Sequence, residues 1–134
     1  MPVQAVMAAS AAPQGANTKL EPNPAAIRGI PTVQNTATLE IQGRMLRLFG
    51  VEGTRGRAVR DFRRYLGARE VVCEPAGTIS EYRCRVDGND LSRVVLFNGG
   101  GKASASAPPE LRALEQQARS TRVGIWSGRE EDDD

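Results

Sequence analysis

The clearest alternation of apolar and polar residues lies between Gln42 and Glu52, which is also the densest apolar stretch of the chain. A run this short, bounded by Gly43 and by the glycine- and arginine-rich segment Gly53–Arg57, predicts a β-strand rather than a helix. Successive side chains of a strand point to opposite faces, so the run divides into two sets. We expect one face to carry Met45, Arg47, Phe49 and Val51, and the other Leu46, Leu48 and Gly50.

Arg47 is the charged residue in the middle of this apolar strand. An unpaired buried charge is costly, so its guanidinium must face either a partner or a cleft. Two interpretations follow, a functional arginine at a binding site and an arginine held in a structural ion pair.

The neighbouring segments predict more strands and a helix. Thr32–Ile41 alternates and is rich in β-branched residues, and Gln42–Gly43 suits a hairpin turn into the central strand. Arg57–Leu66 has apolar residues at helical spacing, and Gly67 provides a stop signal. We expect Ala58, Phe62, Tyr65 and Leu66 on the inner face of this helix, and Arg57, Arg60, Arg63 and Arg64 elsewhere on it.

The second half of the chain predicts a β-hairpin and then a short helix. Arg69–Glu74 and Glu81–Val86 are expected to be strands joined by a turn that begins at Pro75–Thr78. Asp90 is a suitable N-cap for a helix over Leu91–Phe97.

The last elements are a short strand and a longer helix. Lys102–Ala107 predicts a strand with small side chains, and Pro108–Glu110 is typical of a helix start. Gly124–Trp126 is expected to pack the end of this region onto the body. The inner stripe of the last helix would hold Leu111, Leu114, Ala118 and Val123.

Composition divides the chain into three parts. Residues 1–31 are rich in small and polar residues and are expected to form a flexible arm, within which Val3–Ala12 faintly resembles the end of a secretory signal without its basic region. Residues 32–128 suffice for one domain with a modest core. Residues 129–134 are expected to be an acidic disordered tail. The order of elements predicts an α+β domain and is compatible with a five-stranded OB barrel carrying about three helices.

Charge is unevenly spread, although the net charge of the whole chain is only +2. Between Arg28 and Arg129 there are 17 basic and 10 acidic residues, a net charge of +7, and Glu130–Asp134 adds five acids. A basic body suits an anionic partner, and an acidic segment can mask such a surface or promote solubility. An arginine-rich surface that is simply solvated is the alternative.

The chain contains no histidine, which excludes Ser-His triads, histidine acid–base catalysis and imidazole metal sites. Its two cysteines, Cys73 and Cys84, are too few for a structural zinc site. If the hairpin turn centres between Thr78 and Ile79, the two cysteines lie directly opposite each other, and a cross-strand disulfide would indicate an oxidising compartment. The alternative is a pair of buried thiols in the cytosol.

Three segments together carry a resemblance to a known family. Arg44–Glu52 resembles a strand of the form R-I-R-L-x-G-I-D, and Val72–Leu91 resembles the pattern V-x-C…C-x-V-D-G-x-D-L. Leu114–Gly128 resembles a helix of the form E-x-x-A-R followed by G-I-W. These are motifs of staphylococcal nuclease-like (thermonuclease) domains, and the similarity runs in order from about Thr32 to Gly128.

The resemblance implies an OB-fold barrel with packed helices. Family members that cleave nucleic acid hold calcium with acidic residues, activate water with a glutamate and clamp the phosphate with two arginines. In this sequence Arg47 matches the first phosphate arginine, and Glu52 matches the acid at the end of the central strand, one methylene longer.

The remaining catalytic positions are changed. Where the family has D-G-D-T, this chain has Asn35–Thr38, with Ala37 in place of a calcium ligand. Arg55 stands in place of the glutamate base, Ile79 in place of the second arginine, and Lys102–Ala107 lacks the tyrosines that stack on bases. A lone carboxylate is a poor calcium site, so these changes predict loss of the nuclease reaction.

We therefore expect a non-catalytic binding module with no cofactor and no metal, whose partner is a protein or a nucleic acid. Its ligand-binding residues would form a rim of Arg44, Arg47, Arg55 and Arg57. We expect a monomer that does not insert into membranes and is periplasmic or secreted, or cytoplasmic if the cysteines are reduced. The scarcity of aromatic residues argues against strong single-strand binding, because that mode depends on base stacking.

Two other functional hypotheses remain open from the sequence. In the first, the chain is a calcium-dependent phosphodiesterase with a rearranged site, in which Glu52 and Glu40 hold the metal. In the second, the arginines are structural, and Arg47 pairs with Glu52 or Asp87 inside the barrel.

Overall fold

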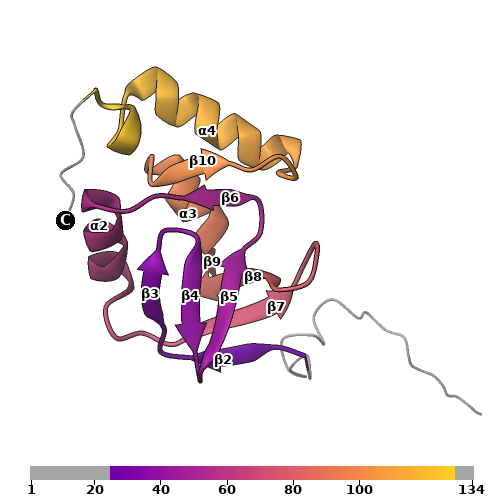
Figure 1. Cartoon of the computed structure of the whole chain (residues 1–134). Coiled ribbons are helices and arrows are strands. Elements are labelled where there is room, and N and C mark those ends of the chain that lie inside the picture. The colour runs from indigo at the N-terminus through magenta and orange to yellow at the C-terminus, as the bar shows by residue number, and fades with distance from the viewer. Residues whose placement is uncertain (1–24, 129–134) are drawn as a thin grey trace, which may run out of the picture.

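The computed structural model describes residues 25–128, and the expected arm over 1–24 and acidic tail over 129–134 lie outside the described residues. The described part is a mixed α+β fold with three α-helices, as predicted (Figure 1). The helices are α2 (Arg57–Leu66), α3 (Leu91–Phe97) and α4 (Pro109–Thr121), and a 3₁₀ turn, η2 (Gly124–Trp126), follows. The strands are β2 (Ile27–Gly29), β3 (Thr32–Asn35), β4 (Thr38–Ile41), β5 (Arg44–Leu48), β6 (Val51–Gly53), β7 (Val71–Pro75), β8 (Glu81–Val86), β9 (Asn89–Asp90) and β10 (Gly101–Ala103).

The larger sheet has seven strands in the order β2-β7-β8-β5-β4-β3, with β9 paired to β8. The β5–β8 pairing is parallel, and the other pairings are antiparallel. The end strands β2 and β3 are not paired with each other, so the sheet does not close, and β6 and β10 form a separate two-stranded sheet. The described residues therefore confirm the mixed α+β class, with more and shorter strands than the five predicted and with a sheet that is not closed.

The densest apolar run, predicted as one strand over 42–52, is two strands. Gly50 has a φ of +79° and turns the chain between β5 and β6. A Cβ at this position would lie 2.6 Å from Leu111 Cδ1, so α4 packs directly on the turn. The predicted faces hold within β5, where Leu46 and Leu48 are buried and Met45 and Arg47 are exposed. They fail after the turn, where Val51 is buried.

The predicted strand over Thr32–Ile41 is a hairpin of β3 and β4. Asn35 ends β3, and its Oδ1 accepts a hydrogen bond of 2.8 Å from the Ala37 N–H, which stabilises the turn. Gln42 and Gly43 form the predicted next turn, with φ angles of +53° and +79°, and align Ile41 with Arg44.

The helices and the β7–β8 hairpin follow the sequence pattern closely. The bounds of α2, β8 and α3 are those predicted, and Asp90 Oδ1 accepts a 3.3 Å hydrogen bond from the Ser92 N–H at the start of α3. On α2 the buried residues are Val59, Phe62 and Leu66, whereas the predicted core residues Ala58 and Tyr65 are half-buried.

The last third of the chain covers the two-stranded sheet. β10 is shorter than predicted, because the chain turns at Ser104 and buries Ala107 before α4. Leu111 and Ala118 are the buried residues of α4. η2 returns toward the body, where the Ile125 N–H donates a 2.8 Å hydrogen bond to the Gly99 carbonyl.

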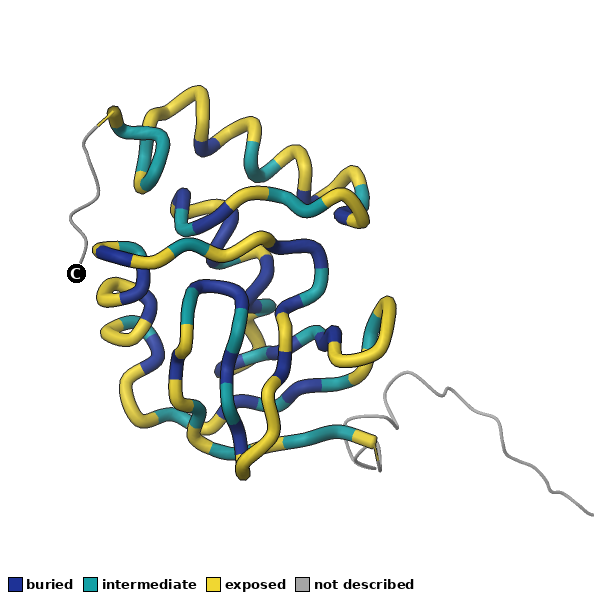
Figure 2. Tube along the Cα trace, in the orientation of Figure 1, coloured by how far each residue is buried: buried dark blue, intermediate teal, exposed yellow. Residues whose placement is uncertain are grey.

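The core lies between the larger sheet, α2 and α3, as the buried segments of Figure 2 show. A disulfide joins Cys73 and Cys84, which are fully buried and directly opposite each other in the β7–β8 pairing, so the predicted pair is confirmed. Ile27 of β2 is aligned with Cys73 on the other side of β7. The segment 25–31, predicted as the end of the arm, therefore contributes a strand to the sheet.

Candidate functional site

The turn between β3 and β4 lies against the segment that follows β6. The Thr36 N–H donates a 3.2 Å hydrogen bond to the Thr54 carbonyl, and the Thr54 N–H donates one of 2.8 Å to Thr36 Oγ1. Thr36 is fully buried by this contact. The structure thereby brings together the Asn35–Ala37 turn and the Gly53–Thr54 segment, which are distant in the sequence.

Close packing leaves little space between these segments. A Cβ added to Gly53 would lie 2.4 Å from Asn35 Oδ1 and 2.7 Å from the Ala37 nitrogen. Asn35 Oδ1 already accepts the Ala37 N–H, and Ala37 is buried. This turn therefore offers no carboxylate oxygen, and its one side-chain amide oxygen holds the turn together.

The two carboxylates of the rearranged-site hypothesis lie on different strands. Glu52 is exposed on β6, where it is aligned with Lys102 of β10, and Glu40 lies on β4, where its Oε1 accepts a 3.4 Å hydrogen bond from Gln34 Nε2. In the described part of the chain, no three acidic or cysteine side chains gather closely enough to hold a metal ion. Calcium takes six to eight oxygen ligands, whereas two carboxylates offer at most four.

Arg47 lies on the exposed face of β5. It is aligned with Thr38 of β4 and with Glu81 of β8, and its backbone N–H donates a 2.8 Å hydrogen bond to the Ser80 carbonyl. Within residues 25–128 no ion pair joins it to Glu52 or Asp87, so the expected structural pairs are not formed. Arg47 is exposed, and it is aligned with Thr38, which directly follows the turn between β3 and β4.

Other arginines form structural ion pairs of the kind that was considered for Arg47. Arg69 pairs with Asp87 at 2.7 Å and lies over the Tyr65 ring. Arg83 contacts Asp90 at 3.3 Å and Glu110 at 3.2 Å, which ties β8 to the starts of α3 and α4. Burial raises the pKa of the Asp90 carboxyl, and the Arg83 guanidinium opposes that shift.

The remaining arginines of the predicted rim do not form one cluster. Arg44 follows the β4–β5 turn, which lies beside β2 at the bottom of Figure 1. Arg55 and Arg57 lie between the end of β6 and the start of α2, at the opposite end of the β3–β4–β5 sheet (Figure 1). The β5 register aligns Arg47 with Thr38, which directly follows the turn that contacts Thr54.

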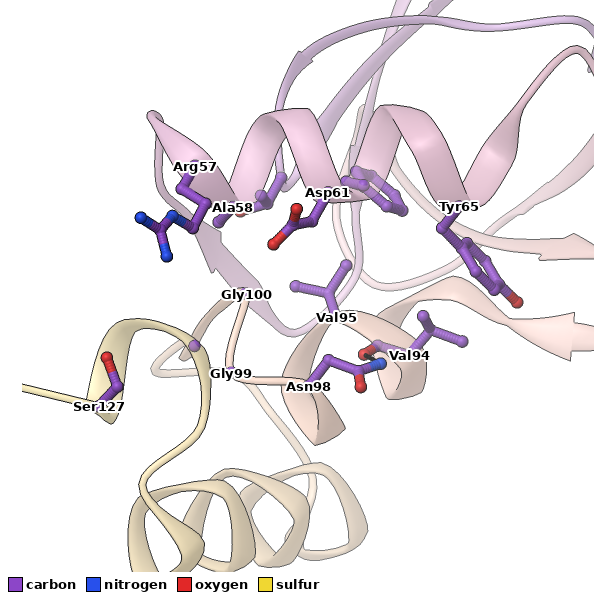
Figure 3. Close-up of a pocket in the computed structure, with 13 residues that line it drawn as sticks. Arg57, Ala58, Asp61, Tyr65, Val94, Val95, Asn98, Gly99, Gly100 and Ser127 are labelled. Atoms are coloured by element: carbon purple, nitrogen blue, oxygen red, sulfur yellow. Dashed lines mark hydrogen bonds between the residues drawn. The ribbon is translucent and has the colours of Figure 1, made fainter. Parts of the chain in front are cut away.

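A cavity of about 520 Å³ lies between α2, α3 and the segment around η2. Sequence reasoning missed it, although Arg57, Asp61 and Tyr65 recur every four residues along one stripe of α2. Figure 3 shows these side chains along one wall, with Val95 and Asn98 of α3 opposite them. The cavity is therefore lined by apolar side chains together with a cation, an acid, a phenol and an amide.

One end of the cavity lies next to the last described residues of the chain. Arg57 and Ser127 both line it and stand at the same end in Figure 3, whereas Tyr65 and Val94 lie toward the other. Asp61 pairs with Arg64 at 3.3 Å along the helix surface.

Within residues 25–128 no helix is long and apolar enough to cross a membrane. Comparison with protein-family models and with curated proteins gave no match.

Proposed function

We propose that this chain is a staphylococcal nuclease-like, OB-fold domain that binds an anionic partner and does not cleave it. The observation that carries the proposal is the contact between the Asn35–Ala37 turn and the Gly53–Thr54 segment. These two contacting segments are the ones that the resemblance aligns with the family's acidic residues, and they carry an amide, a methyl group and the cation of Arg55 in place of carboxylates.

The chain path supports the family assignment. Three antiparallel strands, β3, β4 and β5, precede a helix and a disulfide-linked hairpin, and β5 pairs in parallel with β8. This is an order expected of a partly open Greek-key barrel. Arg47 is exposed on the third strand, and the resemblance aligns it with the family's phosphate arginine.

The chemistry of the site favours binding over hydrolysis. Hydrolysis of a phosphodiester needs a positioned base and stabilisation of the developing charge. Neither contacting segment carries a carboxylate, although Glu52 directly precedes the second segment. Arginine without a metal still attracts phosphate or carboxylate groups. Met45, which is 52% exposed two residues before Arg47 on the same face, adds apolar surface for a partner.

The first experiment is a cleavage assay with a fluorogenic single-stranded DNA at alkaline pH and millimolar calcium. A chelator and the Arg47→Ala variant are the controls. We expect no cleavage above these controls. Cleavage that is lost with the chelator and in the variant would contradict the proposal and support a calcium-dependent phosphodiesterase with a rearranged site.

The nature of the partner is tested by binding of two probes, a single-stranded oligonucleotide and an acidic peptide. Phosphate-driven binding falls steeply with ionic strength. Tighter binding of the oligonucleotide than of the peptide at equal charge would assign nucleic acid, and the reverse would assign a protein. Binding of neither probe would contradict the proposal.

The buried disulfide also supports a compartment. Disulfides persist in oxidising environments, so we propose that the protein is periplasmic or secreted. Lysis of cells directly into a denaturant that contains an alkylating agent, followed by mass measurement, is expected to leave Cys73 and Cys84 unmodified. Full alkylation of both residues would contradict this localisation.

A further inference from the structure

Strand β5 has a partner strand along one of its sides but only along part of the other. Residues 44–47 are aligned with β4, whereas β8 is aligned only with Arg47 and Leu48. β8 begins at Glu81, and the residues before it form a turn, in which the Glu81 N–H donates a 3.1 Å hydrogen bond to the Thr78 carbonyl. The first half of β5 therefore has an open edge.

The main chain of Met45 points toward this open edge. The Leu48 N–H donates a 2.8 Å hydrogen bond to the Ala37 carbonyl, on the side of β4. The Arg47 N–H donates one of 2.8 Å to the Ser80 carbonyl, on the side of β8. Hydrogen-bonding groups of successive strand residues alternate between the two sides, so the N–H and the carbonyl of Met45 point to the same side as those of Arg47. No described residue is aligned with Met45 on that side.

The two end strands of the larger sheet are protected by side chains. On β3, the Val33 carbonyl accepts a 3.1 Å hydrogen bond from Arg63 Nη2. On β2, the Arg28 carbonyl accepts one of 2.8 Å from Gln42 Nε2. Such contacts limit the pairing of an exposed edge with other chains. Within residues 25–128 no side chain covers the main chain of Met45 in this way, so the open edge of β5 is available for pairing.

Apolar and positive side chains lie beside the open edge. Met45 is 52% exposed, and Ile79, in the turn before β8, is 90% exposed. Arg44 and Arg47 are also exposed, and within residues 25–128 neither forms an ion pair. A segment lying along this edge would therefore meet main-chain hydrogen-bonding groups, apolar surface and two cations.

We propose that an extended acidic segment of a partner protein binds the open edge of β5 as an additional strand. In this mode of recognition, main-chain hydrogen bonds give affinity and alternate side chains give specificity. Arg44 and Arg47 select acids, whereas Met45 and Ile79 select apolar residues between them. A second copy of β5 would bring the same arginines against these. The inference rests on the proposed function, because it identifies the anionic partner as a protein segment.

Hydrogen exchange at the Met45 amide tests the pairing directly. The probe is a seven-residue peptide in which glutamate and valine alternate. In the free protein we expect this amide to exchange rapidly. With free peptide at about ten times its dissociation constant, exchange is expected to slow about tenfold, because the amide is unpaired in about one molecule in eleven. The amide of Gly43, in the exposed β4–β5 turn, is the control and is expected to keep its rate.

Two outcomes of the exchange experiment would overturn the proposal. The first is an unchanged rate at Met45 with bound peptide. The second is exchange at Met45 that slows with protein concentration alone, because this would place a second copy on the edge.

A pair of variants separates the main-chain contact from the side-chain contact. Met45→Pro removes the N–H, which has no partner in the β4 pairing, and proline is tolerated where the N–H faces solvent. Met45→Ala removes the same side chain but keeps the N–H. We expect the proline variant to bind the peptide about tenfold more weakly than the alanine variant, the usual effect of one hydrogen bond. Equal affinities of two folded variants would overturn the proposal, and the exchange experiment decides if the proline variant does not fold.

The peptide also distinguishes this inference from the proposed function. The same peptide with lysine in place of glutamate is expected to bind at least about tenfold more weakly, since it meets Arg44 and Arg47 with like charge. Tighter binding of a single-stranded oligonucleotide than of the glutamate peptide would overturn the inference and leave the proposed function intact. Binding of neither would contradict both.

Discussion

At the scale of single residues, Gly53 determines how the two segments of the candidate site meet. Its backbone approaches Asn35 and Ala37 so closely that a methyl group has no room. The atoms that a Cβ on Gly53 would meet belong to the backbone or to short side chains. A change of side-chain rotamer therefore does not make room for it. A glycine is therefore required here by close approach and not by a positive φ.

Gly53→Ala is expected to destabilise the fold by about 1–3 kcal/mol, the usual cost of overpacking. The measurement is the midpoint and slope of unfolding in urea. Gly100→Ala is the matched control, because a Cβ there meets its nearest atoms at 3.3 Å and its strain is smaller. A Gly53→Ala variant as stable as the wild type would show that the two segments are not held in contact.

Asp90 gives a pH-dependent prediction. Burial raises its folded-state pKa above the ordinary value of 3.8, so the folded state holds the proton more tightly than the unfolded state. Stability from this residue is therefore present below pH 3.8 and is lost as pH rises through the raised pKa.

Asp90→Asn keeps an oxygen that can accept the Ser92 N–H but removes the titration. Relative to the wild type, this variant is expected to gain stability as pH rises above 3.8. Urea unfolding at several pH values between 3 and 7 measures the difference. Glu70→Gln, an exposed acid replaced in the same way, is the control, and a difference independent of pH would contradict the assignment.

At the scale of elements, the sequence pattern was sufficient to predict the bounds of a helix or a strand where a single hydrophobic periodicity runs between two turn or stop signals. The helix over Arg57–Leu66 and the strand over Glu81–Val86 have the predicted bounds for this reason. The sequence pattern gave the wrong structure where a turn is stabilised by residues that are distant in the sequence. Thr36 and Ala37 look like part of an alternating strand, but they are buried against residues about eighteen positions further along the chain.

The candidate site was predicted in the same uneven way. Arg47 and Glu52 are predicted site residues that rest on the motif of one strand, and the structure shows that both are exposed. The cavity beside α2 was not found, since its walls come from α2, α3 and the segment after η2, and only the tertiary fold brings them together. Residue types such as Asp61 and Asn98 carry no signal of this proximity in the sequence.

The disulfide between β7 and β8 is an element-scale prediction. It closes a loop with a sequence separation of 11 between fully buried residues. Replacing both Cys73 and Cys84 by alanine is expected to lower the free energy of unfolding by about 2–4 kcal/mol. Denaturant unfolding with and without a reductant measures this. The reductant should destabilise the wild type and leave the double variant unchanged, and equal sensitivity of the two proteins would contradict a stabilising disulfide.

At the scale of the whole molecule, the charge of the body and the position of Arg47 make separate contributions to binding an anionic polymer. A net charge of +7 over residues 28–129 attracts any polyanion at low salt. A specific phosphate contact adds counterion release, which changes the slope of log K against log salt by about 0.7 for each phosphate of a single strand. The slope therefore distinguishes a contact from general attraction.

Arg47→Ala is expected to weaken oligonucleotide binding at low salt and to reduce that slope by about 0.7, because one phosphate contact is lost. Arg28→Ala removes the same charge from β2, far from the contact between the β3–β4 turn and β6, and is expected to leave the slope unchanged. Fluorescence anisotropy across a salt series measures both variants. Equal slopes for the wild type and both variants would mean that binding is general attraction, and Arg47 would then have no special part in it.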